Sequence, residues 1–229
     1  MMIDIKNLTK TYKVDGQKIN AVDNVSFTCS KGEYISVVGH SGSGKSTLLS
    51  LIGGLTRPDS GDIVIDGTAI HSLNDKALSD FRNKKLNFIF QFASLIPTLT
   101  ALENVMLPTA FSASHERTKE DIKKEAVRFL ETVGLSGKFN AYPAQLSGGQ
   151  QRRVAIVRSF INNPDIILAD EPTGDLDEDT EAEMIKIFKT MNKEKGLTFI
   201  VVTHSSSIAN EAKRVLKMQN GRLEEIGQQ

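Results

Sequence analysis

Residues Gly39-His-Ser-Gly-Ser-Gly-Lys-Ser-Thr47 are the stretch that decides the fold of this chain. The fixed positions of the pattern G-x-x-x-x-G-K-[ST] are filled by Gly39, Gly44, Lys45 and Ser46. The apolar segment Tyr34–Val38 before the stretch is typical of a buried strand, and Thr47–Ile52 after it is typical of a helix. A glycine-rich loop in this context predicts a P-loop, whose backbone N–H groups surround nucleotide phosphates. A turn that matches the pattern by chance is a weak alternative.

The P-loop residues have separate predicted roles. We expect Lys45 to reach the β- and γ-phosphates of ATP, and the Ser46 hydroxyl to bind Mg²⁺. The helix that follows points its positive dipole end at the same phosphates. A dinucleotide-binding fold is excluded because Thr47 stands where the G-x-G-x-x-G pattern needs glycine or alanine. The candidate nucleotide-binding residues here are Gly39, His40, Ser41, Gly42, Ser43, Gly44, Lys45, Ser46 and Thr47.

Two acidic residues follow a second apolar run, in Asp165-Ile-Ile-Leu-Ala169 behind Pro164. The run predicts a strand buried on both faces, so Asp170 and Glu171 would emerge at its carboxyl end, where open α/β sheets bind their ligands. We expect Asp170 to hold the magnesium shell and Glu171 to polarise the attacking water. An acidic pair alone is also typical of a solvated turn or a helix N-cap. The P-loop upstream favours the catalytic interpretation.

A third motif, Leu146-Ser-Gly-Gly-Gln150, predicts another helix N-terminus that binds an anion. Ser147 can cap the helix expected over Gln150–Phe160, and Gly148 and Gly149 leave room for a phosphate. With this motif the chain resembles the nucleotide-binding subunits of ABC transporters over nearly its whole length. In that family the motif, here including Gln150, binds the γ-phosphate of ATP on a partner subunit's P-loop. The resemblance therefore implies a head-to-tail homodimer closed over ATP.

The resemblance also assigns roles to four isolated residues. Tyr12 matches the aromatic residue that stacks on adenine, and Gln91 the glutamine that contacts Mg²⁺ and the attacking water. Asp177 matches the loop that communicates across the dimer, and His204 the histidine that contacts the γ-phosphate. Taken alone, Tyr12 would be an ordinary strand residue and His204 an ordinary loop residue.

Composition restricts the partners that we expect. The 229 residues contain 28 Lys and Arg and 28 Asp and Glu, and zero net charge does not favour a nucleic-acid partner. The single cysteine, Cys29, fits a reducing cytosol, and no apolar run approaches the ~18 residues of a membrane span. Any membrane role must then come through a partner, and the resemblance implies an integral membrane permease subunit, so we expect a cytoplasmic protein that is peripheral on the inner face of the cell membrane.

The pattern along the chain predicts an α/β fold of the P-loop NTPase (RecA-like) class, with a mostly parallel core sheet flanked by helices. Alternating segments at Met2–Tyr12 and Asn20–Thr28 and the run Ile63–Ile65 predict a small antiparallel β subdomain. From Gln91 to Phe160 the character is helical. We expect one ABC ATPase domain over 1–229, with the nucleotide-binding core in 1–90 and 161–229 and an inserted helical subdomain in 91–160. Further predicted elements are the amphipathic helices Thr118–Val133 and Asp179–Lys195 and the strands Thr198–Thr203, Arg214–Met218 and Arg222–Ile226.

The segments Phe90–Pro108, Gly39–Gly44 and Glu171–Asp177 resemble the lipoprotein-releasing and macrolide-export branch of the family. Apolar residues in Phe92–Leu102 are more numerous than a solvated loop needs, so part of them is expected to receive a permease helix. The main alternative is an ABC ATPase of translation or DNA repair, which typically carries two cassettes or a long coiled-coil insertion. The second alternative is a P-loop kinase or switch GTPase, but neither class explains Leu146–Gln150. A GTPase is further disfavoured because Asn83–Leu86 and Asn192–Lys195 lack the aspartate of an N-K-x-D element.

Overall fold

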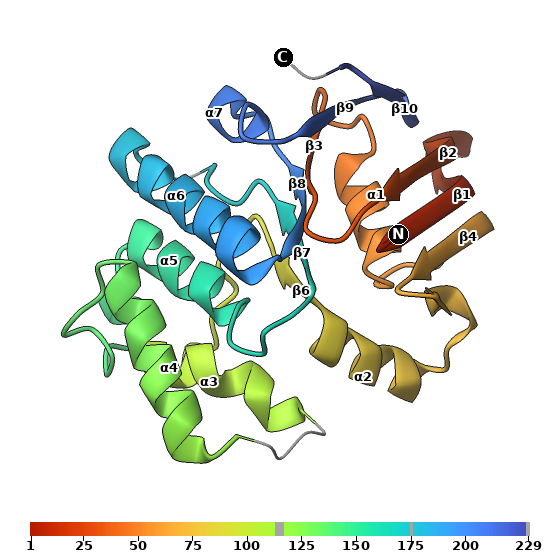
Figure 1. Ribbon diagram of the computed structural model, residues 1–229. Coiled ribbons are helices and arrows are strands. Elements are labelled where there is room, and N and C mark those ends of the chain that lie inside the picture. The colour runs from red at the N-terminus through yellow and green to blue at the C-terminus, as the bar shows by residue number, and fades with distance from the viewer. Residues whose placement is uncertain (113–116, 175, 228–229) are drawn as a thin grey trace.

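The computed structural model describes residues 1–112, 117–174 and 176–227, and it contains a larger and a smaller sheet (Figure 1). The larger sheet has the strand order β10-β9-β3-β8-β7-β6. β10 runs antiparallel to β9, and the other neighbouring strands are parallel. Its strands are β3 (Tyr34–Val38), β6 (Leu86–Ile89), β7 (Ile166–Asp170), β8 (Thr198–Val202), β9 (Arg214–Gln219) and β10 (Arg222–Glu225). The mostly parallel core sheet is therefore confirmed.

Strand β7, next to the edge strand β6, is apolar without alternation because both of its faces are covered. Ile166 and Leu168 belong to one hydrophobic core, and Ile167 and Ala169 belong to a second core on the other face of the sheet. All four side chains are fully buried. A strand covered on both faces needs apolar residues at every position, because successive side chains point to opposite faces.

The smaller sheet is antiparallel, in the order β2-β1-β4-β5, as predicted. The hairpin strands extend beyond the segments expected from the sequence, and they meet at Asp15 and Gly16, which have φ of 49° and 79°. Positive φ at both central residues is the requirement of a tight hairpin turn. The strands are β1 (Ile3–Val14), β2 (Gln17–Cys29), β4 (Ser60–Ile65) and β5 (Thr68–Ala69). This sheet shares the first core with α1.

Helices cover both faces of the larger sheet (Figure 1). They are α1 (Lys45–Ile52), α2 (Asp75–Lys85), α3 (Ala101–Met106), α4 (Lys119–Thr132), α5 (Gly148–Arg158), α6 (Glu178–Lys195) and α7 (Ser206–Ala209), with short 3-10 turns at Ile70–Ser72, Leu107–Phe111 and Pro143–Gln145. α3, α4 and α5 pack against one another and share the second core with α6. The division into core and helical subdomains stays a prediction. Within the described part of the chain, no helix combines the length and apolar character needed to cross a bilayer.

Two local expectations differ from the structure. Residues 91–100 form an irregular loop where the sequence suggested helical character. Helix α2 was not predicted because only Leu78 in it is buried, so its apolar periodicity is weak. Its start is nevertheless encoded, since the Asn74 side chain accepts a hydrogen bond of 2.9 Å from the Ala77 amide as an N-cap.

The phosphate loop is wedged between the two sheets. A Cβ on Gly44 would lie 1.9 Å from the Ala21 carbonyl oxygen of β2, and one on Gly39 would lie 2.2 Å from the Met218 oxygen of β9. The Gly221 amide donates a hydrogen bond of 3.0 Å to the Ser43 carbonyl. Only glycine permits these approaches, so the neighbouring strands fix the path of the loop.

This packing of the loop between the sheets predicts that two alanine substitutions in the loop lower the free energy of unfolding by different amounts. Gly42 and Gly44 both have positive φ, but a Cβ on Gly42 meets no described atom within 4 Å. Gly42→Ala should lower the free energy of unfolding by about 1 kcal/mol, from backbone strain alone. Gly44→Ala adds the clash with β2 and should cost about 2–4 kcal/mol. Urea denaturation measures both, and equal costs would contradict the wedge.

Candidate functional site

Lys45 lies at the centre of the site and is buried. Its Nζ donates hydrogen bonds of 2.7 Å to the Gly39 carbonyl and 3.0 Å to the His40 carbonyl. Burial lowers the pKa of Lys45, and the negative charges of Glu171 and Asp170 oppose that shift. The structure therefore brings the predicted lysine of the P-loop near the predicted acidic pair.

Glu171 follows the last residue of β7 in a left-handed conformation, with φ of 45°. Its amide donates a hydrogen bond of 2.9 Å to the Val202 carbonyl of β8. One carboxylate oxygen, Oε2, accepts a hydrogen bond of 3.1 Å from the His204 amide, and His204 Nε2 lies 3.2 Å from Oε1. Oε1 is buried and accepts no hydrogen bond from the described residues. Non-glycine residues rarely adopt this conformation, and those that do are often found at functional sites.

A cavity of about 450 Å³ brings three predicted residues together from the ends of three neighbouring strands. Gln91 comes after β6, Glu171 after β7 and His204 after β8. The complete lining is Gln91, Glu171, Thr173, Gly174, Leu176, Glu181, Thr203, His204 and Ser205. A carboxylate, an imidazole and an amide that converge here can bind and polarise a water molecule.

The sequence did not single out Glu181 in this lining. Its Oε1 accepts hydrogen bonds of 3.1 Å from Thr173 Oγ1 and 2.6 Å from Ser205 Oγ. Glu181 thus joins the loop after Glu171 to the loop after His204. The available signal was its spacing of one helical turn from Asp177, which places both at the start of α6.

A second cavity of about 820 Å³ lies beside the phosphate loop and is lined by Gly42, by β2 and by the β9–β10 turn. Ile19 of β2 lines it and is paired with Tyr12 of β1, so the two side chains share a face of the sheet. Tyr12 is 41% exposed. The Tyr12 ring is therefore accessible, and its stacking on adenine stays a prediction.

The Leu146–Gln150 motif lies apart from this chain's own phosphate loop. Its helix α5 packs against α3 and α4, whereas α1 packs on β7 and β8 (Figure 1). Ser147 is the N-cap of α5 as predicted: its Oγ accepts a hydrogen bond of 3.3 Å from the Gln150 amide, and Gln150 Oε1 accepts one of 3.0 Å from the Ser147 amide. A Cβ on Gly148 would meet no described atom within 4 Å.

Asp177 is an exposed N-cap at the start of α6. Its carboxylate accepts hydrogen bonds of 3.0 Å from the Thr180 amide and 2.8 Å from Thr180 Oγ1. These hydrogen bonds lower the pKa of Asp177. The neighbouring Asp175 of the Glu171–Asp177 motif lies outside the described residues. The contacts of Asp177 within the chain therefore give it a capping role, and its role across a dimer stays a prediction.

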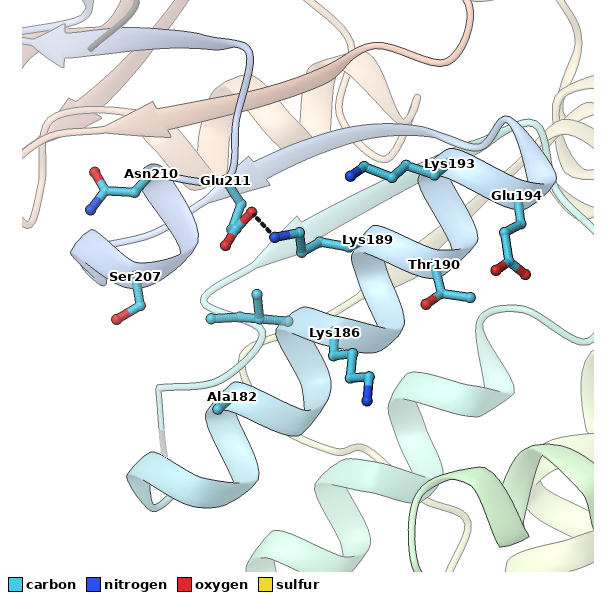
Figure 2. Close-up of a pocket in the computed structure, with 10 residues that line it drawn as sticks. Ala182, Lys186, Lys189, Thr190, Lys193, Glu194, Ser207, Asn210 and Glu211 are labelled. Carbon is cyan, nitrogen blue, oxygen red and sulfur yellow. Dashed lines mark ion pairs between the residues drawn. The ribbon is translucent and has the colours of Figure 1, made fainter.

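Figure 2 shows a third hollow, an open groove of about 630 Å³ between α6 and α7. Lys186, Lys189 and Lys193 project from α6 beside it, but Lys189 pairs with Glu211 at 2.7 Å and Glu194 adds a further negative charge. None of the predicted site residues lines this groove. Its mixed charge gives no reason to place a phosphate there.

Comparisons with known proteins agree with this geometry. Residues 22–174 match the family described as ABC transporter. An uncharacterized ABC transporter ATP-binding protein of Methanocaldococcus jannaschii is 45% identical over 97% of this chain and 95% of its own. The lipoprotein-releasing system ATP-binding protein of Treponema denticola is 43% identical over 97% of both chains.

Two further matches concern a longer relative and a solved structure. The macrolide export ATP-binding/permease protein of Rhodopirellula baltica is 42% identical over 98% of this chain, which spans 33% of that relative's length. A dimeric ATP-binding cassette in a post-hydrolysis state with ADP and phosphate superposes with a TM-score of 0.94, at 42% identity over 100% of this chain and 99% of that chain. The chain therefore belongs to the ABC transporter family, as an ATP-binding cassette ATPase.

Proposed function

We propose that this chain is the ATPase subunit of a transporter of the lipoprotein-releasing or macrolide-export type. It works as a head-to-tail homodimer at the cytoplasmic face of the membrane and drives an integral membrane permease. The convergence of Gln91, Glu171 and His204 on one cavity, with Glu171 close enough to Lys45 to affect its pKa, carries the proposal. The named relatives support the type of transporter, and the dimeric cassette with ADP and phosphate supports the dimer.

The residues of the site divide the work of hydrolysis. The loop amides and Lys45 bind the phosphates and stabilise negative charge that develops on the γ-phosphate. Glu171 orients and deprotonates the attacking water, because its carboxylate lines the cavity into which Gln91 and His204 also project. The His204 amide donates a hydrogen bond to Oε2 of this carboxylate, and the His204 side chain contacts the γ-phosphate in this proposal.

The donor atoms at the site fit Mg²⁺. Ser46, Gln91 and Asp170 offer a hydroxyl, an amide and a carboxylate oxygen, which are the hard ligands that this ion prefers. Such a small set is typical of magnesium sites in which substrate phosphates supply further ligands. When bound, the ion neutralises charge on the β- and γ-phosphates.

Glu171→Gln tests the catalytic assignment. The substitution removes the base but keeps the shape of the side chain, so ATP affinity should stay near the wild-type value. The turnover rate should fall by about 100-fold or more. A stable dimer should accumulate with ATP, because hydrolysis no longer separates the subunits, and gel filtration measures this. Lys45→Ala is the comparison variant and should weaken ATP binding itself. Near wild-type hydrolysis by Glu171→Gln would remove Glu171 from this role.

Ser147→Arg tests the head-to-tail arrangement. The motif serves the partner's ATP in this proposal, so a monomer of the variant should bind ATP normally but fail to dimerise or hydrolyse. Mixing Ser147→Arg with Lys45→Ala chains should restore at most one working site per dimer, which ATPase assays on titrated mixtures detect. Loss of ATP binding by monomeric Ser147→Arg would contradict the arrangement.

The loop after Gln91 supports a docking surface for the permease. Phe92 is 72% exposed and Ile96 is 41% exposed, whereas Leu95 and Leu102 pack partly against the second core. The buried Asn104 holds this loop: its Oδ1 accepts a hydrogen bond of 2.8 Å from the Ile96 amide, and its Nδ2 donates to the Ile96, Leu99 and Thr100 carbonyls. A firmly held loop with exposed apolar side chains suits an amphipathic helix of the permease.

A charge on this loop should separate docking from catalysis. Thr98→Glu, and likewise Ser94→Glu, should leave the ATPase rate of the isolated subunit unchanged. Both should abolish association with the permease or stimulation by it, because docking would bury an unpaired carboxylate. Lys217→Glu, on the exposed C-terminal surface, is the matched control. Co-purification with the permease measures the outcome. If the control loses binding while both loop variants keep it, the docking site lies on the other face.

A further inference from the structure

The buried Arg152 in the second turn of α5 joins three separate segments of the chain. Only 2% of the residue is exposed. Its Nη1 donates to the carbonyls of Phe90 and Gln91, and its Nη2 donates to the Glu171 carbonyl. Its Nε donates a hydrogen bond of 2.7 Å to the Pro172 carbonyl. One guanidinium therefore holds the backbone at the ends of β6 and β7, on both sides of the catalytic cavity.

The guanidinium is suited to keeping these segments in register. Its donors form a rigid planar fork, so the carbonyls cannot move independently without breaking a charged hydrogen bond. A buried cation that loses its acceptors is strongly unfavourable. If α5 shifts, the carbonyls of Gln91 and Glu171 must therefore follow it.

Glu171 is the residue most sensitive to this restraint. Its left-handed backbone is fixed on the amide side by the Val202 carbonyl and on the carbonyl side by Arg152. Strained backbone persists only where surrounding contacts over-determine it. Loss of Arg152 removes one of these restraints and frees the carboxylate to leave its orientation toward His204.

The same helix begins at the motif that is directed outward. Ser147 caps α5 one turn before Arg152, and Arg158 in its last turn donates hydrogen bonds of 3.1 Å and 3.0 Å to the Ala93 and Ser94 carbonyls. A single rigid helix thus carries the phosphate-facing glycines at one end and holds the loop around Gln91 along its length.

We propose that Arg152 is a positioning residue that couples the two ATP sites of the dimer. When the motif at the start of α5 closes on the partner's ATP, Arg152 moves Gln91 and Glu171 of its own site into their catalytic arrangement. This inference rests on the proposed head-to-tail dimer. By linkage, ATP at one site then favours closure of the other.

The test uses Arg152→Met, which keeps an unbranched apolar side chain but has no donor, and Arg152→Gln, whose amide retains two donors. Arg117→Met is the control, because Arg117 also donates to a carbonyl, that of Ile161, but touches neither catalytic loop. Arg152→Met should bind ATP as a monomer within about twofold of wild type, but its kcat should fall by about 30-fold. Its Hill coefficient for ATP should fall to one. Arg152→Gln should recover most of the loss, and Arg117→Met should keep the wild-type kcat and Hill coefficient.

Each other outcome overturns the inference. If the thermal midpoint of Arg152→Met falls as that of Arg117→Met does while kcat and the Hill coefficient stay wild-type, Arg152 is merely structural. If the kcat of Arg152→Met falls but its Hill coefficient does not, Arg152 positions the residues of its own site but does not couple the two ATP sites. Should Arg152→Met fail to fold, Arg152→Gln is compared with the wild type instead. Arg152→Gln must then show a lower kcat and a lower Hill coefficient than the wild type. ATP-dependent dimerisation of Glu171→Gln is measured in parallel: its absence would reject the proposed dimer itself, whereas its presence leaves any failure with Arg152.

Discussion

Parallel pairing of β6, β7 and β8 beside β3 is the constraint on which the site depends. The carboxyl ends of parallel strands lie at the same edge of the sheet. The residues that follow these strands therefore meet at that edge without any special conformation of the loops. The register pairs Asp170 with Val202, and the amide of Glu171 extends this ladder by one hydrogen bond to Val202. A slip of one residue would turn the apolar side chains of β7 to the wrong cores and remove Glu171 from the cavity.

The charged side chains at this edge of the sheet are stabilised by backbone carbonyl dipoles as well as by one another. Lys45 donates to carbonyls of its own loop, and Arg152 donates to carbonyls at the ends of β6 and β7. These carbonyl acceptors belong to the loop and to the strand ends, so their positions are fixed by the fold before a nucleotide arrives. Dipoles and charges fixed before the reaction need little reorganisation during it, which is the main electrostatic advantage of an enzyme site.

The sequence predicted the parts of the molecule that local pattern determines. The phosphate loop, the buried strand before Asp170 and the N-cap at Ser147 each follow from residue types at short spacing, and all three lie where they were expected. Other parts depend on contacts between distant segments. Helix α2 buries little, and Glu181 and Arg152 act through hydrogen bonds to other segments of the chain. From the sequence, Arg152 would be expected on the surface, because it lies in the polar first part of a helix. Only the fold shows that it is buried.

The space around each glycine shows whether the fold itself requires glycine at that position. Gly39 and Gly44 are required from inside, because carbonyls of β9 and β2 occupy the space of a side chain. Gly148 has open space around its Cβ position and no positive φ, so nothing in the described fold requires glycine there. The open space beside Gly148 is what the proposed binding of a phosphate at the start of α5 would use. Through Arg152, α5 is also joined to the ends of β6 and β7 in the same molecule.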